Sequence, residues 1–158
     1  MDTGTAPAAT TPKNDSIVKP YKLSHGTLMC CDMKKSRQFY EEFLGLEVVR
    51  HAKPAMMFRL ATGMHVVAVE CSPDKLWDMH VLHHWGVDVA TKEEVDEAYK
   101  NAQEQKDKYG IRKIMKPVMQ HGVYSFYIQD LDKNWWEIQY APNQHEECFE
   151  RGDVMPME

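Results

Sequence analysis

Similar residues recur 59 positions apart along this chain, and this repeat predicts that the chain folds as two copies of one unit. Within each copy the residue pattern indicates a strand, a helix and three further strands, which is a βαβββ unit. Two such units packed side by side predict an α+β fold: one curved, eight-stranded mixed sheet with both helices outside and a concave interior. The matching pairs are His25 and His84, Asp32 and Thr91, and Tyr40 and Tyr99.

The two units are expected at about residues 21–73 and 79–142, and together they make one domain, 21–142. Helices are expected at 33–44 after the N-cap residue Asp32, and at 92–109 after a capping box formed by Thr91 and Glu94. Gly45 and Gly110 are expected to end these helices. The strands are expected at 22–29, 47–51, 56–60 and 65–70 in the first unit, and at 81–89, 114–117, 123–129 and 135–140 in the second.

The two ends of the chain and its charge limit the possible partners. Residues 1–20 have almost no large apolar side chains and are expected to form a disordered leader, and residues 143–158 an acidic, irregular tail. With a net charge of −5, the chain is not expected to present the positively charged surface that binds nucleic acid or an anionic membrane, so neither is expected as a partner. No run approaches the roughly 18 apolar residues of a membrane span, and a signal-peptide pattern is absent. The expected location is the cytoplasm.

Strand alternation predicts a metal site in the concave interior. It places His84 on the face opposite the apolar residues of strand 81–89, and Glu137 on the face opposite those of strand 135–140. His25 lies on the strand that begins the first unit, at the position equivalent to His84. Two imidazoles and one carboxylate form a facial triad with open positions, which suits Fe(II). Mn(II), Zn(II) and Ni(II) also accept these ligand types.

Five motifs lie on the predicted elements: Ser24-His25-Gly26-Thr27-Leu28 leading into Asp32, Ser36-Arg37-Gln38-Phe39-Tyr40, Phe43-Leu44-Gly45-Leu46-Glu47, His84-Trp85-Gly86-Val87-Asp88-Val89, and Asp130-Leu131-Asp132-Lys133-Asn134-Trp135-Trp136-Glu137. In this order they resemble the vicinal oxygen chelate superfamily, which contains glyoxalase I, fosfomycin-resistance proteins, methylmalonyl-CoA epimerase and type I extradiol ring-cleaving dioxygenases. The resemblance covers about residues 21–142. It implies His25, His84 and Glu137 as the metal ligands.

Within the superfamily, strand 65–70 favours the extradiol enzymes. Glyoxalase-like and epimerase-like members take a fourth metal ligand from this strand, whose middle residues here are Val67 and Ala68. His65 and Glu70 stand at its ends and have opposite parity, so only one of them can face inward. A site with three protein ligands is the extradiol arrangement.

The resemblance to extradiol enzymes also implies catalytic residues. These enzymes keep a tyrosine ten residues before the carboxylate ligand, and Tyr127 lies ten residues before Glu137. Tyr127 is therefore implied as a hydrogen-bond donor to the bound oxygens. His121, expected on the same strand face as Tyr127, or alternatively His65, is implied as the acid/base group.

The function expected from these features is an Fe(II)-dependent dioxygenase that cleaves a catecholic ring with O2, so the partners are an aromatic small molecule and O2. The alternative is a metal-dependent lyase or isomerase of the same superfamily, in which the metal acts only as a Lewis acid. A ligand-sequestering binding protein is the third possibility. A homodimer is expected, because an open eight-stranded sheet leaves edges and aromatic surface to cover.

Overall fold

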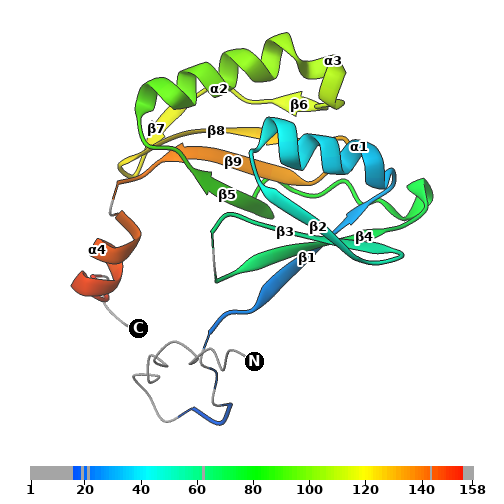
Figure 1. The fold of residues 1–158 in the computed structure, drawn as a ribbon. Helices are drawn as coiled ribbons and strands as arrows, with labels where there is room; N and C mark the ends of the chain where they lie inside the picture. Colours follow the sequence, from blue (N-terminus) through cyan, green and yellow to red (C-terminus); the bar gives the residue numbers. More distant parts are fainter. Residues whose placement is uncertain (1–15, 19, 21, 62, 143, 155–158) are drawn as a thin grey trace.

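The computed structural model describes residues 16–18, 20, 22–61, 63–142 and 144–154 of the 158-residue chain. Most of the expected leader lies outside these residues. The described strands form two mixed sheets, of four and five strands, and α1, α2 and α3 lie on one side of them (Figure 1). The expected α+β architecture of two βαβββ modules is confirmed, although the two modules carry separate sheets.

The first module contains the four-stranded sheet. Its strands are β1 (His25–Cys30), β2 (Glu47–Ala52), β3 (Ala55–Arg59) and β4 (His65–Glu70). They lie in the order β1-β4-β3-β2, with β1 parallel to β4 and the other neighbours antiparallel. Leu28 and Cys30 are buried in the core, so the alternate residues His25, Thr27 and Met29 take the opposite face.

The second module repeats this arrangement. Its strands are β5 (His84–Asp88), β6 (Lys113–Ile114), β7 (Val118–Gln120), β8 (Val123–Gln129) and β9 (Trp135–Tyr140). The order β5-β9-β8-β6 and the parallel pair β5–β9 match the first sheet, which confirms the duplication. The strand expected at 114–117 is instead two short strands that both pair with β8. Pro117 lies between them, and it has no N–H to donate to the ladder.

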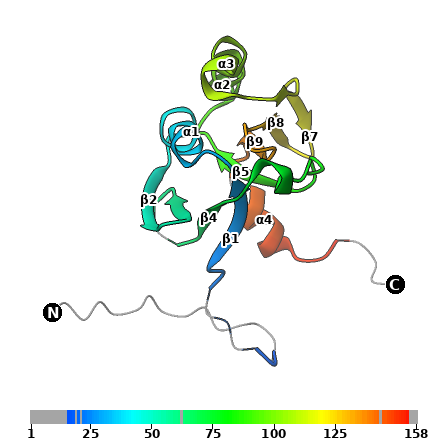
Figure 2. The ribbon, with the colours of Figure 1, turned by 90° about the vertical axis from the view of Figure 1, so that its right-hand side faces the viewer.

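The helices begin where the caps predict. Asp32 accepts a hydrogen bond from the Lys35 backbone N at 3.1 Å and starts α1 (Met33–Gln38), which continues into the π-helical turn η1 (Phe39–Phe43). The capping box is formed in full and starts α2 (Lys92–Glu104). The expected single helix 92–109 is interrupted at Gln105, and α3 (Lys106–Tyr109) then ends at Gly110, whose φ is 66°. Figure 1 shows α3 following α2, and Figure 2, which views these helices along their axes, shows α1 beside them.

Aromatic side chains from both modules pack in one core. Tyr40 stacks on Phe58 with ring centroids 4.2 Å apart, and Trp136 of the second module lies 5.7 Å from Tyr40. The Trp85 ring occupies the space over Gly26, where an added Cβ would lie 1.7 Å from it. At this contact β1 and β5 approach each other through a side chain, and the two strands belong to different sheets. The strands that carry His25 and His84 therefore meet at the centre of the molecule.

The turn between β8 and β9 ties the modules together through the buried carboxylate of Asp130. Asp130 accepts hydrogen bonds from the Asn134 backbone N at 2.9 Å, the Trp136 indole at 3.1 Å and the Tyr40 hydroxyl at 3.3 Å. Burial, followed by the charge of Asp132, raises the pKa of Asp130 to about 7. The carboxyl that anchors this turn is therefore largely protonated in weakly acidic solution.

Asp130→Asn is expected to change how stability depends on pH. Because the pKa of Asp130 is raised in the folded state, its stabilising contribution is complete below its unfolded value near 3.9 and is lost as pH rises through about 7. Urea unfolding at pH 5 and pH 8 should therefore show wild type losing stability relative to Asp130→Asn, by at most about 1.4 kcal/mol per pH unit in that window. An equal stability difference at the two pH values would contradict the raised pKa.

The C-terminal tail differs from the expected irregular segment. Residues Gln144–Arg151 form the helix α4, which neither Pro nor Gly interrupts and which ends at Gly152, with φ 72°. In the described part of the chain, no helix is long and apolar enough to cross a membrane.

Candidate metal and active site

His84 and Glu137 approach each other on one face of the second sheet. They lie on the parallel neighbours β5 and β9, where Gly86 is the register partner of Glu137. His84 precedes Gly86 by two positions and therefore shares its face. The His84 Nε2 atom lies 3.2 Å from Glu137 Oε2, and the two side chains are 26% and 12% exposed. Two of the three predicted ligands thus form a contact pair.

Hydrogen bonds to neighbouring groups orient this pair. His84 Nδ1 lies 2.7 Å from the Val81 carbonyl oxygen, which can only accept, so Nδ1 carries the hydrogen in the neutral imidazole. Ser125 Oγ donates to Glu137 Oε1 at 2.6 Å. In the neutral imidazole the Nε2 lone pair therefore faces the carboxylate as a second acceptor, and either a proton on Nε2 or a bound metal cation stabilises such an arrangement. An imidazole nitrogen and a carboxylate are ligand types that bind a divalent metal, so the pair fits such an ion.

Tyr127 lies beside the pair on β8. It is the direct register partner of Glu137, because the β8–β9 hairpin turns midway between them, and this explains their ten-residue spacing. Its ring meets the His84 ring edge-on with centroids 5.0 Å apart. Burial, followed by the hydrogen bond to Glu137 and the charge of that carboxylate, raises the pKa of Tyr127 to about 12. The hydroxyl is therefore protonated, and available as a donor, throughout the neutral range.

His25 lies on the first sheet beside His65. Their strands pair in parallel with these two residues in register, and the imidazole rings stack at 5.5 Å with an interplanar angle of 17°. The Ser24 hydroxyl lies 2.6 Å from His25 Nδ1. Within the part of the single chain that the structure describes, no three His, Cys, Asp or Glu side chains gather as a metal-binding group. The structure therefore joins His84 with Glu137, and His25 with His65.

The structure places the remaining predicted residues, Glu70, His65 and His121, in different surroundings. Glu70 pairs in register with the core residue Cys30, whereas His65 pairs with His25. Glu70 and His65 therefore point to opposite faces of β4, as expected. His121 does not share a strand face with Tyr127, because β8 begins only at Val123 and His121 lies in the preceding turn with φ 50°. It lines a different cavity. Of the two candidate acid/base histidines, His65 contacts a predicted metal ligand, because its ring stacks on His25.

Ser125 and Val81 were not identified from the sequence. Ser125 has the same parity as Tyr127 on β8, and this alternation is the signal that could have placed it on the ligand face. The Val81 carbonyl is a backbone group in the segment before β5, and no residue pattern identifies such a partner.

The sequence matches one protein-family model, described as Glyoxalase/Bleomycin resistance protein/Dioxygenase superfamily, over residues 22–138. Comparison with curated protein sequences gave no match.

Several solved structures share the fold. The fosfomycin resistance protein FosX from Listeria monocytogenes, complexed with Mn(II) and sulfate, matches with a TM-score of 0.61 and 24% identity over 82% of this chain and 95% of that chain. Lactoylglutathione lyase from Agrobacterium tumefaciens matches with a TM-score of 0.56 and 19% identity, over 77% and 94% respectively. A glyoxalase/bleomycin resistance protein/dioxygenase from Alicyclobacillus acidocaldarius matches with a TM-score of 0.57 and 18% identity, over 78% and 94%. At these identities the comparisons show the fold alone.

Proposed function

Because the chain belongs to the Glyoxalase/Bleomycin resistance protein/Dioxygenase superfamily, we propose that it is a metal-dependent enzyme, and specifically an extradiol-type dioxygenase. Its reaction opens a catecholic ring at a carbon–carbon bond next to the two hydroxyls and places both atoms of O2 in the product. The observation that carries the proposal is the group formed by His84, Glu137 and Tyr127, in which a protonated phenol lies beside a matched pair of metal ligands.

The metal is proposed to be Fe(II), held by His84 Nε2, the Glu137 carboxylate and His25. When bound, Fe(II) supplies both Lewis-acid and one-electron redox chemistry. The protein fixes the ligands for it: the Val81 carbonyl holds the His84 tautomer, and the Ser125 hydroxyl orients Glu137. The bond to the Val81 carbonyl raises the basicity of His84 Nε2, and both bonds restrict the orientation of the ligands.

Two further residues act on the substrate in this proposal. The Tyr127 hydroxyl donates a hydrogen bond to oxygen atoms that gain negative charge during ring cleavage, and its raised pKa keeps it in the donor form. His65, stacked on His25, removes the proton of one substrate hydroxyl and returns it later in the reaction. His121 has no role here because of its place in the β7–β8 turn.

The functional unit is proposed to be a homodimer. Val49 on the outer strand β2 is 47% exposed, and the face of the first sheet that carries His25 and His65 lies opposite the helix-packed core. In this arrangement His25 reaches the metal from the same chain or from a second copy facing it. Either source completes the three-ligand set that a single described chain does not gather.

Oxygen dependence distinguishes the dioxygenase from a lyase or isomerase of the same superfamily. Purified protein, loaded anaerobically with Fe(II), should convert a panel of catechols only after O2 is admitted, with a ring-opened chromophore forming as O2 is consumed. Hemithioacetal and epoxide substrates should not react in either atmosphere. Turnover of those substrates at the same rate with and without O2 would instead support the lyase or isomerase.

A further inference from the structure

A cavity of about 470 Å³ adjoins the candidate site and lies between β1 and the segment that joins the two modules. Thr27 and Met29, which share a strand face with His25, line one wall, and His84 lies in the lining as well. Met79 and Leu82 from the joining segment form another part of the wall. The volume is that of a small-molecule pocket, and the cavity is in contact with both histidine-bearing strands.

The charge of the lining restricts what the cavity accepts. None of the described residues that line it is Lys or Arg, and the acidic lining residue Asp132 is buried with its carboxylate accepting hydrogen bonds from the Cys31 backbone N and the Ser36 hydroxyl. A phosphonate or carboxylate group placed in this cavity would lose its hydration without gaining a Lys or Arg partner, and His83 and His84 are the only basic side chains among the described lining residues. The apolar and aromatic lining favours a neutral ring instead.

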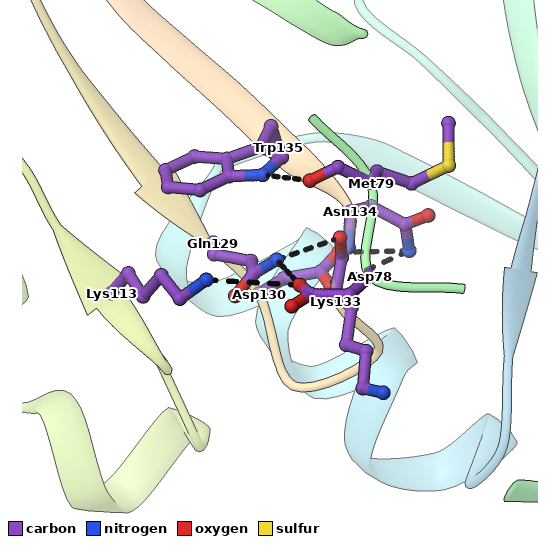
Figure 3. A network of polar contacts seen from close by, with 8 residues as sticks. All are labelled: Asp78, Met79, Lys113, Gln129, Asp130, Lys133, Asn134 and Trp135. Carbon is purple, nitrogen blue, oxygen red and sulfur yellow. Dashed lines mark hydrogen bonds and ion pairs between the residues drawn. The ribbon is translucent and has the colours of Figure 1, made fainter. Parts of the chain in front are cut away.

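Trp77 is held at this cavity although its indole is 70% exposed. The following residue, Asp78, accepts a hydrogen bond from the buried Gln129 amide at 3.0 Å, and Lys113 Nζ lies 3.7 Å from the same oxygen. The Met79 carbonyl accepts from the Trp135 indole N–H at 2.7 Å. Figure 3 shows these contacts converging on the joining segment from β8, β9 and β6. Two tethers directly after Trp77 therefore fix the backbone that carries this exposed aromatic ring.

We propose that this cavity binds the neutral aromatic body of the substrate, and that Trp77 is the residue that selects it by stacking on the ring. The inference rests on the proposed function, because it places the rest of the substrate beside His84. A flat indole held at a pocket edge contributes a large apolar contact at low conformational cost. The substrate class is thus an uncharged aromatic compound whose ring extends from the metal site toward Trp77.

A matched pair of probes tests this without metal or turnover. In the presence of a chelator, 2-naphthol should bind wild type at least about tenfold more tightly than 2-naphthalenesulfonate, which has the same rings and a negative charge. Isothermal titration calorimetry should show Trp77→Ala binding 2-naphthol about tenfold more weakly, with Trp77→Phe retaining most of the affinity. Phe149→Ala, which removes another exposed aromatic from α4, is the matched control and should leave the affinity unchanged.

The outcomes separate this inference from the proposed function. Glu137→Gln alters a proposed metal ligand that does not line the cavity, so it should bind 2-naphthol like wild type even if activity is lost. Equal affinity for the two probes, or equal 2-naphthol affinity in wild type and Trp77→Ala, would overturn the inference. Oxygen-dependent catechol turnover could persist in that case, and the dioxygenase proposal would stand without the Trp77 pocket.

Discussion

Replacing His84 with alanine is expected to lower the affinity for a divalent metal by more than roughly 100-fold, since loss of a group that only supports a ligand costs 10- to 100-fold. The imidazole is fixed with its Nε2 lone pair toward Glu137, so the variant removes a preorganised ligand and leaves the carboxylate without its partner. Glu137→Ala and His25→Ala should lose affinity to a similar extent. Ser125→Ala should lose roughly 10- to 100-fold, because it removes only the hydrogen bond that orients Glu137.

Competition against a fluorescent chelator measures these affinities, with far-ultraviolet circular dichroism to confirm folding. His145→Ala, on the exposed helix α4, is the matched histidine control and should bind metal like wild type. Wild-type affinity in His84→Ala would refute the assigned site. Joint refolding of His25→Ala with His84→Ala chains identifies the source of the third ligand: metal binding returns if His25 is supplied by a second copy, and stays absent if each chain supplies its own.

Tyr127→Phe is expected to slow ring cleavage at saturating metal by roughly 10²- to 10³-fold. Because this hydroxyl also hydrogen-bonds to the proposed ligand Glu137, metal affinity is expected to fall by up to roughly 10-fold. The variant removes one hydroxyl, and loss of one preorganised donor to developing charge has an effect of this size on the rate. Because the pKa of Tyr127 is raised to about 12, the wild-type rate should show no loss from ionisation of this phenol below about pH 10.

Tyr124→Phe is the matched control for Tyr127→Phe. Tyr124 lies three positions earlier on the same strand, and its hydroxyl donates to Asp96 at 2.6 Å, so it takes part in a bond outside the His84–Glu137 pair. Single-turnover kinetics with a saturating catechol should show a wild-type rate for Tyr124→Phe. If the two variants are slowed equally, the slower rate results from a disturbance of β8 and not from the loss of a hydrogen-bond donor at the site.

Local patterns predicted the elements and the faces of the strands. Strand 65–70 has the bounds expected, as do 123–129 and 135–140, because β-branched and aromatic residues bounded by turn residues act over a few positions. The caps at Asp32 and Thr91 form as predicted for the same reason. The parity that placed Glu137 opposite Trp136 also holds, since Trp136 is only 2% exposed in the core.

Features that depend on contacts between distant residues could not be read in this way. The contact between the two modules places the Trp85 ring over Gly26, two residues that lie 59 positions apart in the chain. His121 was assigned to the site from its spacing to Tyr127, but the turn at Gly122, with φ 83°, lies between them. The partner of His25 is set by the β1–β4 register, which placed the ring of His65 against it.

Under the proposed function, both atoms of O2 enter one ring-opened product, and His25, His84 and Glu137 would hold the Fe(II) that this chemistry requires. Mass spectrometry of the product formed under ¹⁸O2, with an oxygen electrode to count the gas consumed, tests it most directly. We expect one O2 to be consumed per ring cleaved, two ¹⁸O atoms in each product molecule before exchange with water, and no product from Glu137→Ala. Product that forms without O2, or that carries no ¹⁸O when formed under the labelled gas, would contradict it.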